Sequence, residues 1–329
     1  MFSSLTIHDC GLERQNLVPI CLDTAPSFPA SPRALKKEEY SVPDSWAAKD
    51  ITLAEGHLEL ALLERISEGR MGVTYSARVV SATRSHVDVS ASLPQVLCLK
   101  FARMQHCRSL AREAWFYEQL TECQGISVAR CFGFFTSTLN KQEVAVESIL
   151  PWNKFQDESD ETEEETEELT WSSPSKDWLP DDFPHTYEFH DVRGLKRDST
   201  WNSWNPSDDN PTIAVLILEK LGERCVEHWE MWQKPKDGLK EDITAIVEDI
   251  GAHGVIHTDV TAFNILHFTG DAVTCPRHNV VHNWRIIDFD RSRKIDMAQA
   301  CDFTKRALES DIKHIGKLGL FWGNLLHTC

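Results

Sequence analysis

The sequence lacks long hydrophobic runs, a secretory signal and an excess of basic residues, and each absence argues against a class of protein. No stretch approaches the roughly 18 uncharged apolar residues of a membrane-spanning helix. The opening MFSSLTIHDC lacks the basic segment followed by an apolar segment that marks secretion. Lysine and arginine number 34 against 51 acids, giving a net charge of −17, which disfavours nucleic acid and anionic membranes as partners. We therefore expect an intracellular protein, cytoplasmic or nuclear, that binds neither.

The ten cysteines are scattered through the 329 residues. They include no C-x-x-C pair, and their spacing is not that of a zinc site. In a chain without a secretory signal, this pattern favours reduced thiols in the core and on the surface. A disulfide framework is the less favoured alternative.

The acidic charge is concentrated in one segment. Residues 156–169 hold nine acidic side chains and no basic one, and removing these nine from −17 leaves −8. The run lies within residues 151–211, which have no sustained periodicity. We interpret 151–211 as an insertion, disordered at least across the acidic run, that could pack locally or bind a protein partner. Its tryptophans are Trp171, Trp178, Trp201 and Trp204.

Hydrophobic periodicity divides the rest of the chain into a strand-rich part and a mainly helical part. Residues 1–50, rich in Ser and Pro, are interpreted as a tail or a segment wrapped over the domain. Apolar runs predict strands at 58–62, 73–80, 96–102, 129–135, 144–150 and 213–218, with an amphipathic helix at about 110–120. Helices are then predicted near 225–233, 239–253 and 307–327. Between the last two, short strands at 264–267 and 284–287 flank a proline-containing turn. The order indicates an α+β chain of two unequal lobes.

The sharpest motif is VIHTDVTAFNIL, residues 255–266. A predicted helix ends at Gly254, a loop presents His257 and Asp259, and Asn264 opens a short apolar strand. A carboxylate in such a loop can accept a hydrogen bond from an attacking hydroxyl, and an amide oxygen five residues later can bind Mg²⁺. The alternative interpretation is an ordinary polar connection between a helix and a strand.

A second acidic motif, RIIDFD, occupies residues 285–290. An apolar strand leads into Asp288, 24 residues after Asn264, and carboxylate oxygen is the ligand that Mg²⁺ prefers. Taken alone, the run is weak evidence for a metal site, because many strands end in Asp. Its distance from the first motif strengthens that evidence.

Together the two segments resemble the H-x-D-x-x-x-x-N catalytic loop and the D-F-G metal-binding segment of protein kinases. The resemblance implies that Asp259 orients the nucleophile, and that Asn264 and Asp288 bind Mg²⁺. It also implies a two-lobed protein-kinase-like fold, with a β-rich N-lobe at 51–220, interrupted by the insertion, and a shortened, mainly helical C-lobe at 221–329.

Residues 66–75 resemble the glycine-rich loop of the same family. Ser67 replaces the first glycine, and the resemblance implies that Gly69 and Gly72 let the backbone lie against the ATP phosphates. Two glycines between strands also suit an ordinary hairpin turn, so this motif is weak by itself.

Lys100, in the predicted strand 96–102, resembles the family's phosphate-positioning lysine. A lysine among apolar strand residues requires a partner, because burial of an unpaired charge is costly. The expected partner is Glu113 in the following helix. Glu118 is the alternative, because helical register is uncertain from sequence.

Two further segments follow the family's order. Residues 216–222 resemble the strand and hinge that receive adenine, which implies nucleotide contacts at Glu219 and Leu221. Residues 311–316 resemble the start of the family's helix αF, without its tryptophan and serine.

Departures from the pattern qualify the functional expectation. Thr258 replaces the arginine of H-R-D, and Asp290 replaces the glycine of D-F-G, which removes backbone freedom and adds a carboxylate. No A-P-E motif follows Asp290, and the peptide-docking helices are missing. The abbreviated form resembles fungal protein-kinase-like domains and, more distantly, the aminoglycoside and choline group of small-molecule kinases.

The favoured hypothesis is an ATP- and Mg²⁺-dependent phosphotransferase, an atypical protein kinase acting on an unknown hydroxyl acceptor. A small-molecule acceptor is an alternative to a protein. A second hypothesis is a pseudokinase that serves as a nucleotide-binding or protein-interaction scaffold through its insertion. A third, less favoured one is a binder of basic proteins through the acidic run alone.

Overall fold

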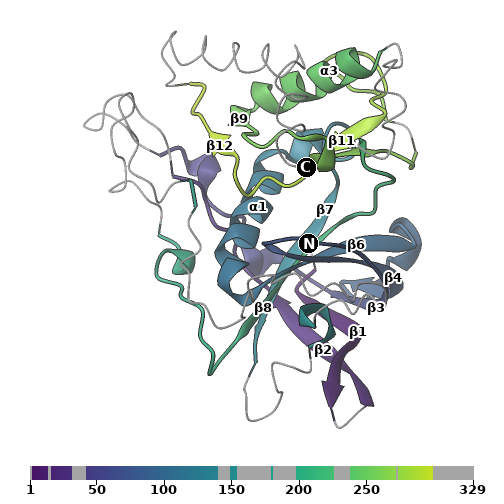
Figure 1. The fold of residues 1–329 in the computed structure, drawn as a ribbon, viewed down its shortest axis with the longest axis vertical. Helices are drawn as coiled ribbons and strands as arrows, with labels where there is room; N and C mark the ends of the chain where they lie inside the picture. The colour runs from purple at the N-terminus through teal and green to yellow at the C-terminus, as the bar shows by residue number, and fades with distance from the viewer. Residues whose placement is uncertain are drawn as a thin grey trace, which may run out of the picture.

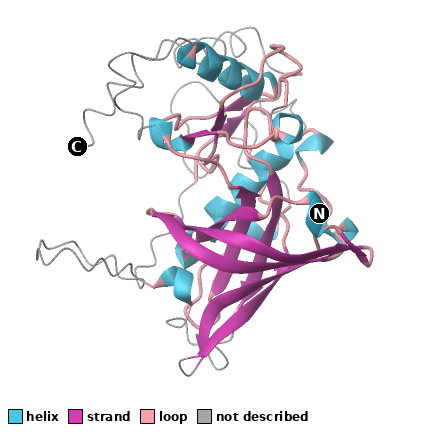
Figure 2. Ribbon diagram, turned by 90° about the vertical axis from the view of Figure 1, so that its right-hand side faces the viewer, coloured by secondary structure: helices cyan, strands magenta, loops and turns pink. Residues whose placement is uncertain are grey.

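The computed structural model describes residues 2–13, 16–31, 42–139, 149–153, 179–180, 198–225, 238–271 and 273–298. Long strands gather in one half of the molecule, and the helix α3 lies in the other half with short strands and loops (Figures 1 and 2). A hydrophobic cluster that includes the helix α1 runs between the two halves.

Seven strands close into a barrel. Because β3 pairs with both β1 and β4, the order β3-β1-β2-β7-β8-β6-β4 returns to β3, and β5 extends the sheet beyond β4. The β1–β3 pair is parallel and the other pairs are antiparallel. The strands are β1 (Ser4–Glu13), β2 (Asn16–Thr24), β3 (His57–Glu68), β4 (Gly72–Arg84), β5 (Val87–Asp88), β6 (Val96–Ala102), β7 (Cys131–Thr138) and β8 (Thr212–Glu219).

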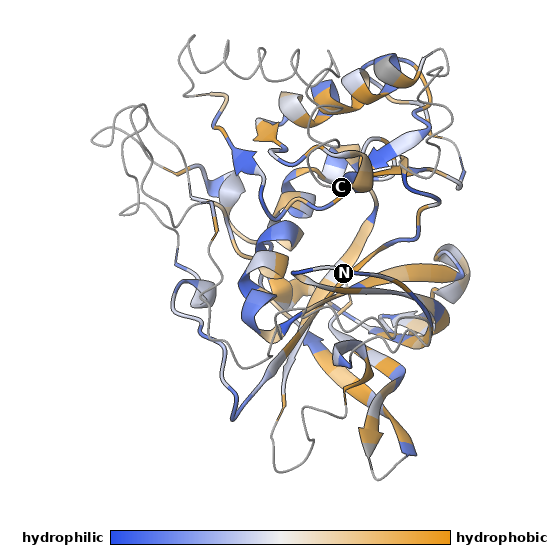
Figure 3. Cartoon of the chain, viewed as in Figure 1, coloured by the Kyte–Doolittle hydropathy of each residue, from blue (hydrophilic) through white to orange (hydrophobic). Residues whose placement is uncertain are grey.

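The alternation of side chains along β8 explains why both of its faces are apolar. Ile213, Val215 and Ile217 belong to the cluster that fills the barrel, whereas Ala214 and Leu216 belong to the cluster outside it. Successive side chains of a strand point to opposite faces, so a strand covered on both sides reads as a continuous apolar run. Figure 3 shows how hydrophobic residues follow the barrel strands.

The helix α1 (Cys107–Gln119) packs on the outside of the barrel, against β8, β7 and β6. Eleven of its thirteen residues are buried, because the short described segments around Phe28, Trp46 and Trp201 join α1 in the outer cluster. Trp201, in the region that we interpreted as an insertion, donates from its indole to the carbonyl of Pro26 at 2.7 Å. That part of the insertion is therefore integrated into the core.

The half around α3 (Leu239–Ala252) has short strands only. β10 (Ile265–His267) pairs with β11 (Trp284–Ile286), and β9 (Val255–Ile256) pairs with β12 (Arg293–Lys294). Gly254, with φ of +69°, ends the helical stretch. An added Cβ at Gly254 would lie 2.3 Å from the carbonyl oxygen of Ile295, so the β9–β12 pairing also favours glycine there.

The two-lobed α+β kinase-like fold that we expected is wrong. The described residues are mostly β, with a closed seven-stranded barrel and two α-helices. In place of a mainly helical C-lobe, the described part of residues 221–329 contains α3 and four strands of two or three residues. The barrel closes because β1 and β2 insert between β3 and β7.

The N-terminal segment therefore differs from the tail expected at residues 1–50. Leu5, Ile7, Ile20 and Leu22 are buried and belong to the cluster inside the barrel. Their alternation is interrupted by a register shift between Ile7 and Gly11, which hides the period-2 pattern in the sequence.

Most of the individual elements predicted downstream are confirmed, with shifted ends. The predicted strand 96–102 coincides with β6, the strands at 58–62, 73–80, 129–135 and 213–218 lie in or overlap β3, β4, β7 and β8, and the helices at 110–120 and 239–253 correspond to α1 and α3. The short strands predicted at 264–267 and 284–287 are β10 and β11. Several predicted segments lie wholly or mostly outside the described residues. They are the strand 144–150, the helices 225–233 and 307–327, the acidic run and the segment 311–316.

Among the described residues, no helix has both the length and the apolar character needed to cross a membrane.

Candidate functional site

Lys100 lies on the outer face of β6, beside α1. Its neighbours Leu99 and Phe101 point into the barrel, so the alternation of the strand turns Lys100 outward. Only 19% of its side chain is exposed. The position therefore places an ammonium group at the boundary between the barrel and the other half of the molecule.

Two carboxylates hold the ammonium group of Lys100. Its Nζ lies 2.6 Å from Oε2 of Glu113 in α1 and 2.5 Å from Oδ1 of Asp288, which follows β11. The structure thus brings together three of the predicted site residues, although 188 positions separate Lys100 from Asp288. The alternative partner Glu118 instead accepts hydrogen bonds from Ser27 and from the Lys49 amide.

The charges of this group are strongly coupled. Burial alone would lower the pKa of Lys100, but Asp288 and Glu113 outweigh it and raise the pKa above its ordinary value. Burial raises the pKa of Glu113 to about 7, against the opposing effect of Lys100. Burial would also raise the pKa of Asp288, but Lys100 lowers it. Asp288 therefore remains the ionised carboxylate beside the cation.

Asp259 and Asn264 form the second half of the site. The side-chain amide of Asn264 donates to the carbonyl oxygen of Asp259 at 2.9 Å and to its Oδ2 at 3.3 Å. The side-chain carbonyl oxygen of Asn264 thereby stays available as an acceptor or as a metal ligand. Ile287 donates its amide to the Asn264 carbonyl at 3.0 Å, so pairing of β10 with β11 sets Asn264 beside the approach to Asp288.

His257 connects the two halves. Its Nε2 lies 2.9 Å from the carbonyl oxygen of Ile287, and its Nδ1 lies 3.3 Å from the amide nitrogen of Asp259. Burial lowers the pKa of His257, so the neutral ring can donate to Ile287 while it accepts from Asp259. This residue was noted as part of the sequence motif, but its role as a positioning residue comes from the structure alone.

Backbone and packing constraints hold Asp288 and Asp290. Asp288 has φ of +71°, a conformation that a non-glycine residue adopts rarely and mostly where surrounding contacts enforce it. The ring of Phe289 is fully buried and packs on Tyr117 and His257 at 5.3 and 4.9 Å between centroids. Arg112 of α1, also fully buried, donates to the carbonyl oxygen of Asp290.

Asp290 adds a second carboxylate close to Asp288. Burial and the charge of Asp288 raise the pKa of Asp290 to about 6. Its side chain lies 3.2 Å from the guanidinium of Arg291. Arg112 was not singled out in the sequence, because nothing in its local pattern shows that it reaches Asp290, 178 positions away.

The two glycines serve different purposes. Gly69 and Gly72 close the β3–β4 hairpin by mutual backbone hydrogen bonds of 2.9 and 3.3 Å. A Cβ at Gly72 would lie 1.9 Å from the carbonyl oxygen of Phe101, whereas nothing lies within 4 Å of a Cβ at Gly69. Gly72 is therefore explained by the close approach of β6, and Gly69 borders open space.

The predicted hinge is engaged in protein contacts. The amide of Glu219 donates to the carbonyl oxygen of Arg130 at 2.8 Å, so it is already paired and an adenine would have to displace that bond. Leu221 is buried, and the next residue, Gly222, donates to the carbonyl of His267 at 2.8 Å. These two positions are not brought into contact with the Lys100 group.

A small cavity of about 10 Å³ borders the Lys100 group. It is lined by Met71, Lys100, His106, Glu113 and Asp290, among others. Ligand pockets commonly measure about 300–1,000 Å³. The cavity therefore has room for about one water molecule and not for a nucleotide or its phosphate groups.

No protein-family model matches the chain, and no curated protein matches it.

Proposed function

We propose that the protein binds ATP with Mg²⁺ and transfers a phosphoryl group to a hydroxyl acceptor. The observation that carries the proposal is the position of Lys100 between Glu113 and Asp288, at 2.6 and 2.5 Å. A cation held in this way can bind a phosphate chain, and a neighbouring carboxylate can bind the accompanying metal. The proposal rests on this group of side chains and not on a kinase fold.

The donor set fits a hard divalent cation. Asp288 offers carboxylate oxygen, and Asn264 keeps its amide oxygen because its nitrogen donates to Asp259. Mg²⁺ prefers such oxygen ligands and keeps several of its waters. Bound Mg²⁺ would supply charge neutralisation for the phosphates. Asn264 and Asp288 are therefore the residues that would hold it.

The remaining residues have distinct roles in this proposal. Glu113 orients Lys100 toward the phosphates, and His257 fixes the backbone on which Asp259 is carried. Asp259 accepts the hydrogen bond of the acceptor hydroxyl and orients it for attack. The acceptor is a hydroxyl group, either of a protein or of a small molecule.

The decisive experiment measures transfer from ATP labelled at its γ-phosphate to a generic protein and to a metabolite pool from a lysate. Asp259→Ala should lower transfer at least about 100-fold, in the range of general acid–base contributions, while ATP binding is retained. Asp271→Ala, at an exposed carboxylate outside the site, is the matched control and should leave transfer unchanged. Unchanged transfer in the Asp259 variant would refute the assigned role.

A second candidate, a scaffold without transferase activity, is favoured by one observation. The cavity beside Lys100 measures about 10 Å³, which is far too small for a nucleotide. A thermal-shift titration with ATP separates the two candidates, because a ligand that binds the folded state raises the melting temperature. Stabilisation that requires Mg²⁺ supports the transferase, and none at any ATP concentration supports the scaffold.

A further inference from the structure

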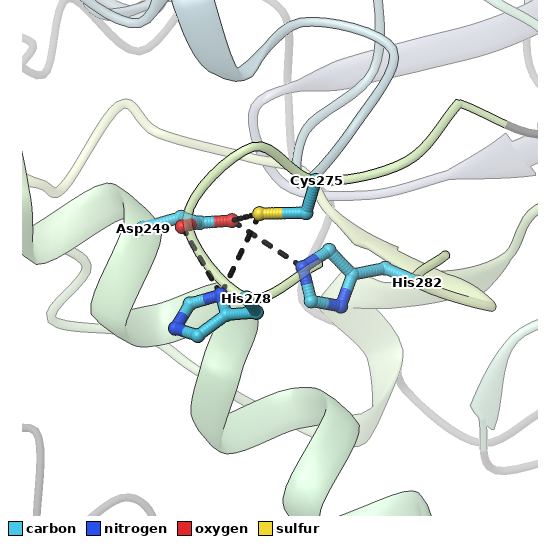
Figure 4. A group of neighbouring side chains, drawn as sticks. All are labelled: Asp249, Cys275, His278 and His282. Atoms are coloured by element: carbon cyan, nitrogen blue, oxygen red, sulfur yellow. Dashed lines mark hydrogen bonds and ion pairs between the residues drawn. The ribbon is translucent and has the colours of Figure 1, made fainter. Parts of the chain in front are cut away.

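Four potential metal ligands converge away from the Lys100 site. Asp249 comes from α3, whereas Cys275, His278 and His282 come from the connection between β10 and β11 (Figure 4). One ligand atom from each lies within 4.8 Å of all the others. Cys275, Asp249 and His282 are buried, and His278 is partly buried.

The separations of the ligand atoms suit a tetrahedral ion. The distances are 3.5 Å from Sγ of Cys275 to Nδ1 of His278, 3.3 Å from Oδ1 of Asp249 to the same nitrogen, and 3.4 Å from Oδ2 of Asp249 to Nε2 of His282. Bonds of about 2.0–2.3 Å to a tetrahedral zinc ion place its ligand atoms about 3.3–3.6 Å apart. Neighbouring pairs of side chains are thus spaced nearly as zinc ligands are, and the whole set of four ligand atoms lies within 4.8 Å.

Both histidines are oriented by carboxylates on the side that faces away from the cluster. Nδ1 of His282 lies 2.5 Å from Oδ1 of Asp242, and Nε2 of His278 lies 3.2 Å from Oε2 of Glu248. Such outer carboxylates fix the ring orientation of metal-binding histidines. Nε2 of His282 faces the cluster, where it lies 3.4 Å from Oδ2 of Asp249 and makes no hydrogen bond of good geometry in the described structure.

The loop that carries three of the ligands is held in one conformation. Thr274 and Val281 form an antiparallel bridge, and the Cys275 amide donates to the carbonyl of Val280 at 2.7 Å. Asn279 accommodates the turn with φ of +55°, a conformation that asparagine tolerates better than most residues. Cys275 and His278 therefore face the cluster through fixed backbone positions.

A metal-free hydrogen-bond network is the competing interpretation. Nε of Arg277 lies 3.2 Å from Oδ1 of Asp249, and Ser127 donates to Oδ2. Burial would lower the pKa of His282, but its bonds to Asp242 and Asp249 raise it to about 10. In that state a protonated His282 would neutralise the carboxylates. In this network the Cys275 thiol donates to Oδ2 of Asp249 at 3.2 Å and both inward ring nitrogens face the same carboxylate, so metal content is the measurement that separates the two interpretations.

We propose that Asp249, Cys275, His278 and His282 bind a single zinc ion in a closed structural site. The mixture of thiolate, imidazole and carboxylate ligands favours zinc over Mg²⁺ or Ca²⁺, which take oxygen ligands. The ion fastens the β10–β11 connection to α3. Because β10 follows Asn264 and β11 leads toward Asp288, the zinc also stabilises the strand pair on which these residues are mounted.

The spacing of this site was missed in the sequence. The spacing of the cysteines alone does not reveal it, because Cys275 is followed by histidines three and seven positions later, in C-x-x-H-x-x-x-H. The fourth ligand, Asp249, lies 26 residues before Cys275. Only the packing of α3 against the connection reveals it.

The test measures zinc in the full chain after reconstitution with Zn²⁺ and removal of the excess. Wild type should hold about one zinc per chain, and Cys275→Ser and His278→Gln should each hold less than about a tenth as much. Cys225→Ser, at another buried cysteine, is the matched control and should bind as wild type does. Reconstitution of wild type with Co²⁺ should give the visible absorption of a tetrahedral site and a thiolate-to-cobalt charge-transfer band.

Either of two results would overturn the proposal. One is folded wild type that holds no zinc and shows no cobalt spectrum. The other is zinc retained by both Cys275→Ser and His278→Gln, which would place the ion elsewhere. If these variants fail to fold, the cobalt spectrum of wild type decides alone, since a thiolate band requires a cysteine ligand and its absence excludes Cys275.

Discussion

The barrel and the α3 half of the molecule are stabilised by different means. The barrel has strands of seven to thirteen residues, apart from the two-residue β5, and an interior filled by apolar side chains. The α3 half has strands of two or three residues, and buried polar groups such as Arg285, His282 and Asp249 make many of its contacts. The candidate site draws on both, with Lys100 on the barrel and Asp259 and Asp288 on the other half.

The two halves of the molecule should therefore depend on different interactions for their stability. Backbone ladders and apolar burial fix the β6 backbone that carries Lys100 without a metal. Buried polar networks are stable only when every member is satisfied. The backbone position of Asp288 should therefore depend on the proposed zinc site and on buried hydrogen bonds, whereas the backbone position of Lys100 should not.

The largest expected effect comes from a cavity created in the core of the barrel. Phe101 is fully buried between β4 and β8, and Phe101→Ala should lower the free energy of unfolding by about 3–5 kcal/mol. Denaturant titration measures it. Phe263→Ala, at a side chain 47% exposed, is the control and should change stability little. Equal losses in the two variants would contradict the proposed barrel core.

Arg285→Met tests the polar half. The fully buried guanidinium donates to the carbonyl oxygens of His282, Trp284 and Gly125 at 2.7–3.0 Å. Loss of these hydrogen bonds should lower the free energy of unfolding by about 2–3 kcal/mol, because buried acceptors are left without donors. Hydrogen exchange should accelerate at β10 and β11 and stay unchanged in the barrel. Acceleration throughout the barrel would show that the two halves are not independent in this way.

Gly72→Ala and Gly69→Ala form a matched pair at one turn of the barrel. A Cβ at Gly72 would overlap the carbonyl oxygen of Phe101, and a Cβ at Gly69 meets nothing. We expect Gly72→Ala to cost about 2 kcal/mol through overpacking, and Gly69→Ala to leave the melting temperature nearly unchanged. A larger loss for Gly69→Ala would contradict the geometry of the hairpin.

The smallest expected effect is on the pH dependence of the free energy of unfolding. It is measured at one buried thiol inside the barrel and at one outside it. Burial raises the pKa of Cys10 and of Cys225 from 9.0 to about 12. As the pH rises, the two thiols ionise in the unfolded chain at a lower pH than in the folded chain. Their contribution to the free energy of unfolding is therefore complete below pH 9 and falls as the pH rises toward 12. Between pH 7 and pH 10, Cys10→Ala and Cys225→Ala should each lose about 1 kcal/mol less stability than wild type. An unchanged loss would contradict the burial of these thiols.

Elements with an uninterrupted pattern were predicted best. The continuous apolar runs of β6 and β8 and the helix ended by Gly254 were found because each follows a local rule. The pairing of Lys100 with Glu113 was predicted through a motif resemblance, whereas the ion pair of Lys100 with Asp288, predicted only as a metal ligand, comes from the structure. By contrast, the closure of the barrel depends on β1 and β2, whose pattern is broken by a register shift.

Long-range neighbours could not be read from local patterns. Nothing near Arg112 indicates that it lies under Asp290, and nothing near Asp249 indicates that it faces Cys275. The expected fold failed for the same reason, because the motifs fix a few side chains and leave the order of strands open.

The central claim is that Asp288 and Lys100 bind ATP together with Mg²⁺, and calorimetric titration with ATP tests it most directly. Wild type should bind ATP at least about tenfold more tightly with Mg²⁺ than with a chelator. Asp288→Asn should bind weakly and equally in both conditions, while Lys49→Met, at an exposed lysine that contacts Thr121, should behave as wild type. Affinity in wild type that is absent, or that ignores Mg²⁺, would contradict the account.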